Sequence, residues 1–217
     1  LPDPNAAFQA NTSFVYWRDG QTKMGNFSVQ NRQSLDYDQM PQSIKDAAVA
    51  AENRTFWTDR GISITGMIRA AWTIVRGGDL QGGSTITQQY IKILYLTSDR
   101  TMTRKLKELF LATKIGREMP KEDILEGYLN TIYFGRGAYG VQAASKAYFN
   151  VDAAQLSVPQ AAFLATVLNN PSAFDPSQPE NEQRILDRYR YVLAGMGEMG
   201  KITPAQVAEY SAKLPDF

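Results

Sequence analysis

The sequence contains neither cysteine nor histidine among its 217 residues. The absence of cysteine excludes disulfides and thiolate chemistry, and it leaves the redox compartment open. The absence of histidine excludes Ser-His-Asp and Cys-His catalysis as well as histidine-ligated zinc. Carboxylates are therefore the candidate general bases, so acid–base chemistry in this chain must use Glu or Asp.

The chain also lacks an excess of charge of either sign. It has 23 basic and 22 acidic residues, a formal net charge of +1, so its overall field does not indicate a nucleic acid or an acidic polymer as partner. Long apolar runs are missing too, since no run exceeds that of residues 161–165, far below the roughly 18–20 residues that span a bilayer. We expect no transmembrane helix here. Because the sequence begins at Leu1 without Met or a leader, we expect a processed or excised fragment.

Apolar residues recur at helical spacing over most of the chain. The first 35 residues instead place extended stretches on either side of Asp19-Gly20, which predicts a β hairpin. From residue 41 onward the spacing predicts a helix that ends near Glu52 and further helices, which open near these residues: Ser84, Thr103, Pro120, Ser157 and Pro204. We expect an N-terminal extended or hairpin segment over 1–35 and one mainly helical domain over 36–217.

Two local patterns indicate chemistry near the middle of the chain. Glu52 precedes Asn53 where a helix gives way to a turn, although most glutamates at helix ends are simply solvated. The run Gly82-Gly83-Ser84-Thr85-Ile86-Thr87-Gln88-Gln89 places two glycines before a helix N-terminus. Free N–H groups and the helix dipole favour an anion such as phosphate there, and a flexible loop with a Ser or Thr cap fits equally well.

Two further patterns follow downstream. Residues 92–117 hold seven basic residues against two acidic ones, a local charge of +5, which suggests either a site for a multiply charged anion or a solvated helix face. Within this stretch Glu108 lies four residues after Arg104, so a helix ion pair is the simplest role for it. In residues 130–140 three glycines punctuate aromatic residues. This pattern favours a tight turn in which Tyr133 and Phe134 are packed.

Together these motifs resemble the peptidoglycan glycosyltransferase domain of class A penicillin-binding proteins, glycosyltransferase family 51. The resemblance rests on blocks in the order and spacing of that family, namely Glu52 with Phe56 and Gly61, the Gly82 to Gln89 run with Lys92, Arg100-Thr101 with Arg104-Lys105 and Glu108, Tyr128-Leu129-Asn130, and Tyr133-Phe134-Gly135. It extends over about residues 36–200. The Gly-Gly-Ser-Thr-Ile-Thr-Gln-Gln block is its most specific part.

The resemblance implies a lysozyme-like, two-lobed helical fold with a small membrane-proximal lobe around residues 62–83. It implies lipid II and the growing glycan strand as partners, a β-1,4-linked glycan as product, and contact with the membrane surface. The expected location is the extracytoplasmic face of the bacterial plasma membrane, and the expected inhibitor is moenomycin. A full-length relative would carry a transmembrane anchor and a penicillin-binding transpeptidase domain as well. No Ser-x-x-Lys or Lys-Thr-Gly motif occurs here, so we expect no β-lactam acylation.

The resemblance also implies a role for each matching residue. Glu52 would be the catalytic base, and Lys92 and Arg100 would bind the pyrophosphate. Glu108 would be the second important glutamate, which either orients these cations or holds a divalent cation such as Mg²⁺ or Mn²⁺; no other cofactor is required. The remaining residues assigned to substrate binding are Ser84, Thr85, Gln88, Gln89, Arg104 and Asn130.

Two departures from the family pattern stand beside the proposed base. Asn53 occupies a position where the family usually has Asp, and residues 58–60 lack the His that the family often has there. Two other functions stay open on the sequence alone, a lysozyme-like peptidoglycan hydrolase or lytic enzyme and a non-catalytic module that binds a lipid pyrophosphate. A DNA-binding helix-turn-helix protein is disfavoured by the near-zero net charge.

Overall fold

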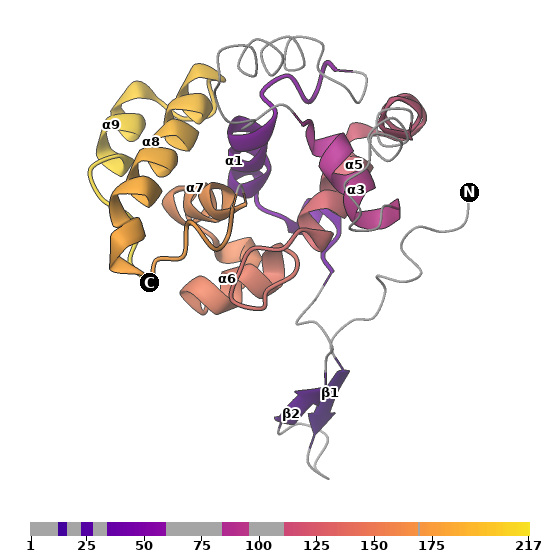
Figure 1. The fold of residues 1–217 in the computed structure, drawn as a ribbon, viewed down its shortest axis with the longest axis horizontal. Helices are drawn as coiled ribbons and strands as arrows, with labels where there is room; N and C mark the ends of the chain where they lie inside the picture. Colours follow the sequence, from indigo (N-terminus) through magenta and orange to yellow (C-terminus); the bar gives the residue numbers. More distant parts are fainter. Residues whose placement is uncertain (1–12, 17–22, 28–33, 60–83, 96–110, 169) are drawn as a thin grey trace.

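The computed structural model describes residues 13–16, 23–27, 34–59, 84–95, 111–168 and 170–217. Helices dominate these residues, as Figure 1 shows. The α-helices with described bounds are α1 (Gln42–Glu52), α3 (Ile86–Tyr95), α5 (Lys121–Thr131), α6 (Val141–Phe149), α7 (Val158–Val167), α8 (Glu182–Glu198) and α9 (Pro204–Tyr210). Three short 3-10 helices join them, η1 (Tyr37–Gln39), η2 (Ala153–Gln155) and η3 (Pro179–Asn181), and residues 111–118 are also helical. The prediction of a mainly helical fold is confirmed.

Two short strands precede the helices. Strand β1 (Ser13–Tyr16) pairs with β2 (Lys23–Phe27) in an antiparallel two-stranded sheet, with Ser13 opposite Phe27. These strands lie in the segment for which the sequence predicts a hairpin, and the residues that connect them lie outside the described part of the chain.

Helices α1 and α7 form the centre of the core. Every residue of α1 from 44 to 51 is buried, and so is every residue of α7 from 161 to 167. A helix that is apolar on all sides, as α7 is, is stable only when other elements cover it. Helix α8 packs against both α1 and α7, while α3 packs against α5, as Figure 1 shows. Glu52 is the last residue of α1, so this buried helix places it among the surrounding elements.

Local signals in the sequence explain the starts of three of the described helices. Ser157 caps α7 and Thr203 caps α9, each in a capping box with the glutamine three residues later, which satisfies backbone donors at the helix N-terminus. The expected cap at Ser157 is confirmed. Helix α3 begins at Ile86 rather than at Ser84, because Thr85 and Gln88 form the capping box there, with Gln88 N donating to Thr85 Oγ1 at 3.2 Å and Thr85 N to Gln88 Oε1 at 2.8 Å.

The glycine-rich turn before α6 is tightly built. Gly140 has φ +84°, and a Cβ placed on it would lie 2.5 Å from the Asn130 carbonyl oxygen, so a side chain there would be both strained and obstructed. Phe134 is fully buried, as expected for a packed turn. Tyr133 is instead 38% exposed, although its ring lies 4.7 Å from that of Tyr139.

Several expected features lie outside the described residues. These are the small lobe around 62–83, the first two glycines of the 82–89 run and the first part of the helix expected from Thr103. Within the described ranges, no helix has the length and apolarity that crossing a bilayer requires.

Candidate active site

Glu52 is held at the C-terminal end of α1 with a side chain that is only 8% exposed. The helix ends at Asn53, whose backbone N–H donates to the Val49 carbonyl at 2.9 Å. A carboxylate this far from bulk water needs polar partners, because burying a charge without them is strongly unfavourable. Two other helices, α3 and α8, supply these partners.

Helix α3 supplies the amide of Gln89. Its Nε2 donates to Glu52 Oε2 at 2.8 Å, and its Oε1 accepts from the Tyr128 hydroxyl of α5 at 3.0 Å. Burial first, and then the negative charge of Glu52, hold the pKa of Tyr128 well above its ordinary value, so this hydroxyl keeps its proton and can donate. Because a carboxylate only accepts hydrogen bonds, the Gln89 amide must turn its NH₂ toward Glu52.

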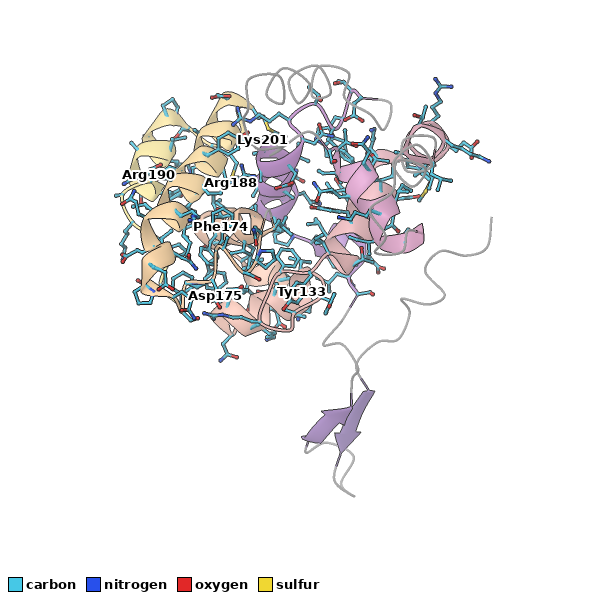
Figure 2. All side chains as sticks on the ribbon, in the orientation of Figure 1. Tyr133, Phe174, Asp175, Arg188, Arg190 and Lys201 are labelled. Atoms are coloured by element: carbon cyan, nitrogen blue, oxygen red, sulfur yellow. The ribbon has the colours of Figure 1, made fainter. Side chains whose placement is uncertain are left out.

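Helix α8 supplies the guanidinium of Arg188. A single nitrogen, Nη2, lies 3.2 Å from Glu52 Oε1 and 2.9 Å from the Ala51 carbonyl oxygen. Figure 2 labels Arg188 on α8 at the side of α1. The two hydrogens on this nitrogen can therefore bind the carboxylate and the end of the helix backbone at once, and the guanidinium also lies over the Tyr191 ring at 4.7 Å.

This arrangement suits a base more than an acid. Gln89 and Arg188 use two of about four lone-pair directions on the two carboxylate oxygens, so the group keeps capacity to accept a proton from a substrate hydroxyl. The geometry at Glu52 thus combines fixed orientation, low exposure and proton-accepting capacity.

A second polar network lies directly after Glu52. Asn53 Nδ2 donates to Asp59 Oδ2 at 2.6 Å, and Lys121 Nζ, at the start of α5, lies 2.9 Å from Asp59 Oδ1. Thr55 Oγ1 donates to Asn53 Oδ1 at 3.1 Å, so both ends of the Asn53 amide are used. The departure at residue 53 therefore has a structural partner, because Asp59 supplies the carboxylate of this network.

The structure separates the expected binding residues into groups. Of the described ones, Gln89 donates to Glu52, whereas Thr85 and Gln88 are buried and cap α3. Ser84 is half-buried just before this cap. Lys92 is exposed on α3, three residues after Gln89 and thus on about the same side of the helix.

Asn130 connects α5 to the segment before η1. Its Oδ1 accepts from the Leu35 N–H at 3.0 Å, and its Nδ2 donates to the Leu35 carbonyl at 2.8 Å. Asn130 is 7% exposed. Its amide thus fastens α5 to the segment before η1, and its role in binding substrate stays a prediction from the resemblance.

Three expected site residues, Arg100, Arg104 and Glu108, lie outside the described part of the chain. The structure therefore neither places these three side chains nor tests the alternative that Glu108 holds a divalent cation.

Sequence reasoning did not find Arg188 or Tyr128 as site residues. Arg188 is separated from Glu52 by 136 positions, and it lies in an amphipathic helix where an arginine is ordinary. Tyr128 sits among the apolar residues of α5, all expected to face inward, and it is fully buried. Its hydroxyl at the edge of that face is a signal for a polar contact, but it does not identify Gln89 as the partner.

Comparison with known proteins adds independent information about this site. A family model described as Transglycosylase matches residues 20–197. The chain is 46% identical over 179 residues to penicillin-binding protein 1A of Mycobacterium tuberculosis, covering 80% of this chain and 22% of the relative. It is 42% identical over 213 residues to penicillin-binding protein 1A of Aquifex aeolicus, covering 96% of this chain and 29% of the relative.

A more distant curated relative and a solved structure agree with these matches. Penicillin-binding protein 1F of Bacillus subtilis is 36% identical over 182 residues, with 83% of this chain and 25% of the relative covered. The crystal structure of penicillin-binding protein 1A from Haemophilus influenzae matches with a TM-score of 0.51 at 19% identity, covering 94% of this chain and 20% of that one, which shows a shared fold.

The chain therefore spans between 22% and 29% of the length of these three curated relatives. The family model covers most of the chain, from before η1 into α8, and so includes Glu52, Gln89 and Arg188. On these grounds the chain belongs to the transglycosylase family.

Proposed function

We propose that this chain is a peptidoglycan glycosyltransferase that polymerises lipid II into β-1,4-linked glycan strands for bacterial cell wall synthesis. The observation that carries the proposal is the buried Glu52 carboxylate, which accepts hydrogen bonds from Gln89 and Arg188 at 2.8 and 3.2 Å. Membership of the transglycosylase family supports the same activity.

In the proposed reaction Glu52 takes the proton from an acceptor sugar hydroxyl as that oxygen bonds to the donor's anomeric carbon. The bond between this carbon and the pyrophosphate oxygen breaks at the same time, so polyprenyl pyrophosphate leaves with the bonding electrons. Direct displacement inverts the configuration at the anomeric carbon. A positioned base of this kind contributes roughly 10²–10⁴-fold to a rate.

The leaving pyrophosphate needs neutralisation of its charge more than it needs a proton. We assign this role to Lys92, which is exposed on α3 beside Gln89, and by resemblance to Arg100 and Arg104. Preorganised cations that face developing negative charge are among the strongest catalytic devices. Glu108 would orient these cations, and Ser84, Thr85 and Gln88 would shape the binding region at the start of α3.

The wider setting of the reaction is also part of the proposal. The substrate's lipid tail stays in the bilayer, so we propose contact with the membrane surface through the small lobe around 62–83, at the extracytoplasmic face of the plasma membrane. This chain matches only 22% and 29% of the length of two of these relatives. We propose that the native protein also contains a transmembrane anchor and a transpeptidase domain.

The main alternative, a lysozyme-like hydrolase, fits the site less well. Such an enzyme protonates a poor leaving group with a carboxylic acid kept neutral by its surroundings. Glu52 instead accepts hydrogen bonds from two donors, the Arg188 guanidinium and the Gln89 amide. A module that merely binds lipid pyrophosphate would have no use for a buried carboxylate fixed by two helices.

The test is incubation of the chain with purified lipid II, followed by separation of the products by length. We expect glycan polymer together with released polyprenyl pyrophosphate, and we expect moenomycin to stop its formation. Cleavage of preformed glycan without polymer growth would instead identify a hydrolase. Saturable binding of lipid II without any turnover would identify the binding module.

A further inference from the structure

We propose, resting on the proposed function, that Asn53, Asp59 and Lys121 act together as positioning residues for Glu52. None of the three contacts the Glu52 carboxylate through a described hydrogen bond. They act instead on the turn that begins where α1 ends, and so on the place of the base relative to α5.

The three side chains form a continuous, largely buried chain of contacts. Asn53 is 7% exposed, and the side chains of Asp59 and Lys121 are 5% and 16% exposed. The contacts are 2.6 Å from Asn53 Nδ2 to Asp59 Oδ2 and 2.9 Å from Lys121 Nζ to Asp59 Oδ1. In surroundings this poor in water, breaking one contact leaves a polar or charged group without a partner, which is more damaging than the same loss at the surface.

Residue 53 controls the direction in which the chain leaves α1. Its backbone N–H closes the last turn of the helix on Val49, and its carbonyl accepts the Phe56 N–H at 2.9 Å. Because Asn53 is bonded to Glu52 through the backbone, a change in the backbone angles of residue 53 also moves the backbone that carries the base.

Two series of side-chain contacts therefore connect the end of α1 to α5. One runs from Asn53 through Asp59 to Lys121, and the other runs from Glu52 through Gln89 to Tyr128. Lys121 and Tyr128 are seven residues apart on α5, so they lie on about the same side two turns apart. Two points of attachment fix both the distance and the tilt of α5 beside the base, which a single contact could not do.

The charges at residues 53 and 59 are matched to each other. One position carries a neutral amide that donates, and the other carries a carboxylate that accepts from both the amide and Lys121. Aspartate at both positions would place two like charges in contact. Asparagine at both would leave the network with no carboxylate to balance the charge of Lys121. Exchange of the two residues keeps one carboxylate and one amide, since Asn at 59 can accept from Lys121 and donate to Asp at 53.

The exchange provides the test. We expect Asn53→Asp and Asp59→Asn each to lower kcat on lipid II by about 10²-fold with little change in KM, the size expected for a misplaced catalytic group. The double variant N53D/D59N should recover at least about ten-fold over either single variant, because neighbouring residues that share a network are not additive. Melting temperatures measured on the same samples should show the same non-additivity.

Lys146→Gln is the matched control. It breaks an ion pair with Asp152 that has the same 2.9 Å separation but side chains 44% and 57% exposed, and it should leave kcat unchanged.

If either single variant does not fold, Lys121→Gln takes its place, because glutamine keeps a donor for Asp59 but loses the charge, and kcat should fall with KM again unchanged. The positioning role alone would be overturned if the single variants kept the parent kcat. It would also be overturned if the fold-loss of kcat in the double variant equalled the product of the two single-variant losses. A folded parent chain that makes no polymer would overturn the proposed function itself.

Discussion

At the scale of single residues, Glu52 depends on two side chains that come from distant parts of the sequence. Gln89 lies 37 positions away and Arg188 lies 136 positions away. The motif at residues 82–89 predicts Gln89 as a binding residue through the family resemblance, but its contact with Glu52 is visible only in the fold. Arg188 could not be predicted in this way, since its role follows from the packing of α8 against α1 and no local pattern distinguishes it from Arg190.

Arg188 gives the first prediction at this scale. Arg188→Gln should lower kcat on lipid II by about 10²-fold, because the Glu52 carboxylate loses its guanidinium and its fixed orientation. Arg188→Lys should retain part of the activity, since an ammonium can still contact the carboxylate. Steady-state kinetics with lipid II measure both effects.

Arg190→Gln is the matched control for that experiment. Arg190 lies on the same helix and donates from Nε to the Ser211 carbonyl at 3.0 Å, near α9. Figure 2 labels it on α8, apart from Arg188. Equal losses of kcat in the Arg188 and Arg190 variants would mean that α8 acts through stability rather than through Glu52.

At the scale of elements, the spacing between α3 and α5 decides whether Tyr128 can reach Gln89. Gly127 sits where α5 meets α3, and a Cβ there would overlap the hydroxyl and ring of Tyr90, which is 1% exposed. Tyr90 follows Gln89 in α3, and Tyr128 follows Gly127 in α5. The close packing of Gly127 against Tyr90 and the hydrogen bond from Tyr128 to Gln89 therefore lie in the same interface between the two helices.

Gly127→Ala should therefore lower both stability and activity. Overpacking of this kind destabilises by about 1–3 kcal/mol, and separation of the helices would break the Tyr128 to Gln89 bond. Denaturant unfolding and kcat on lipid II measure the two effects. A Gly127→Ala variant with the stability and the kcat of the parent chain would contradict this account of the interface.

Helix starts were the most predictable elements, and the reasons are local. Ser157 caps α7 and Pro204 is the first residue of α9, where a cap or a fixed backbone angle acts within a few residues. The start of α3 was misplaced by two residues, because Ser84 and Thr85 can both cap a helix and the partner Gln88 lies three residues after Thr85. The Asn53–Asp59 contact depends on the path of an irregular turn, which helical spacing does not describe.

At the scale of the whole molecule, stability at high pH depends on buried tyrosines. Burial raises the pKa of Tyr148 to about 12, opposed by Arg136 and aided by Asp175, and its hydroxyl donates to the Phe134 carbonyl at 2.8 Å. Between pH 10 and about 12 the unfolded chain loses this proton while the folded chain keeps it. The free energy of unfolding should therefore fall as pH rises through this window.

Tyr148→Phe tests this pH dependence. At neutral pH the variant should be less stable by about 1 kcal/mol, because it loses one hydrogen bond. Above pH 10 its stability should fall less steeply than that of the parent chain, since one titrating group is gone. Denaturant unfolding at a series of alkaline pH values gives both curves, and parallel curves would show that Tyr148 does not contribute.

The central claim is that Glu52 is the base that activates the acceptor hydroxyl, and the rate of glycan elongation by Glu52→Gln tests it most directly. Glutamine keeps the shape of the side chain but cannot take the proton, so elongation from lipid II should fall by roughly 10²–10⁴-fold. Glu180→Gln, at an exposed position in η3, should elongate at the parent rate. Elongation by a folded Glu52→Gln chain at the parent rate would contradict the account.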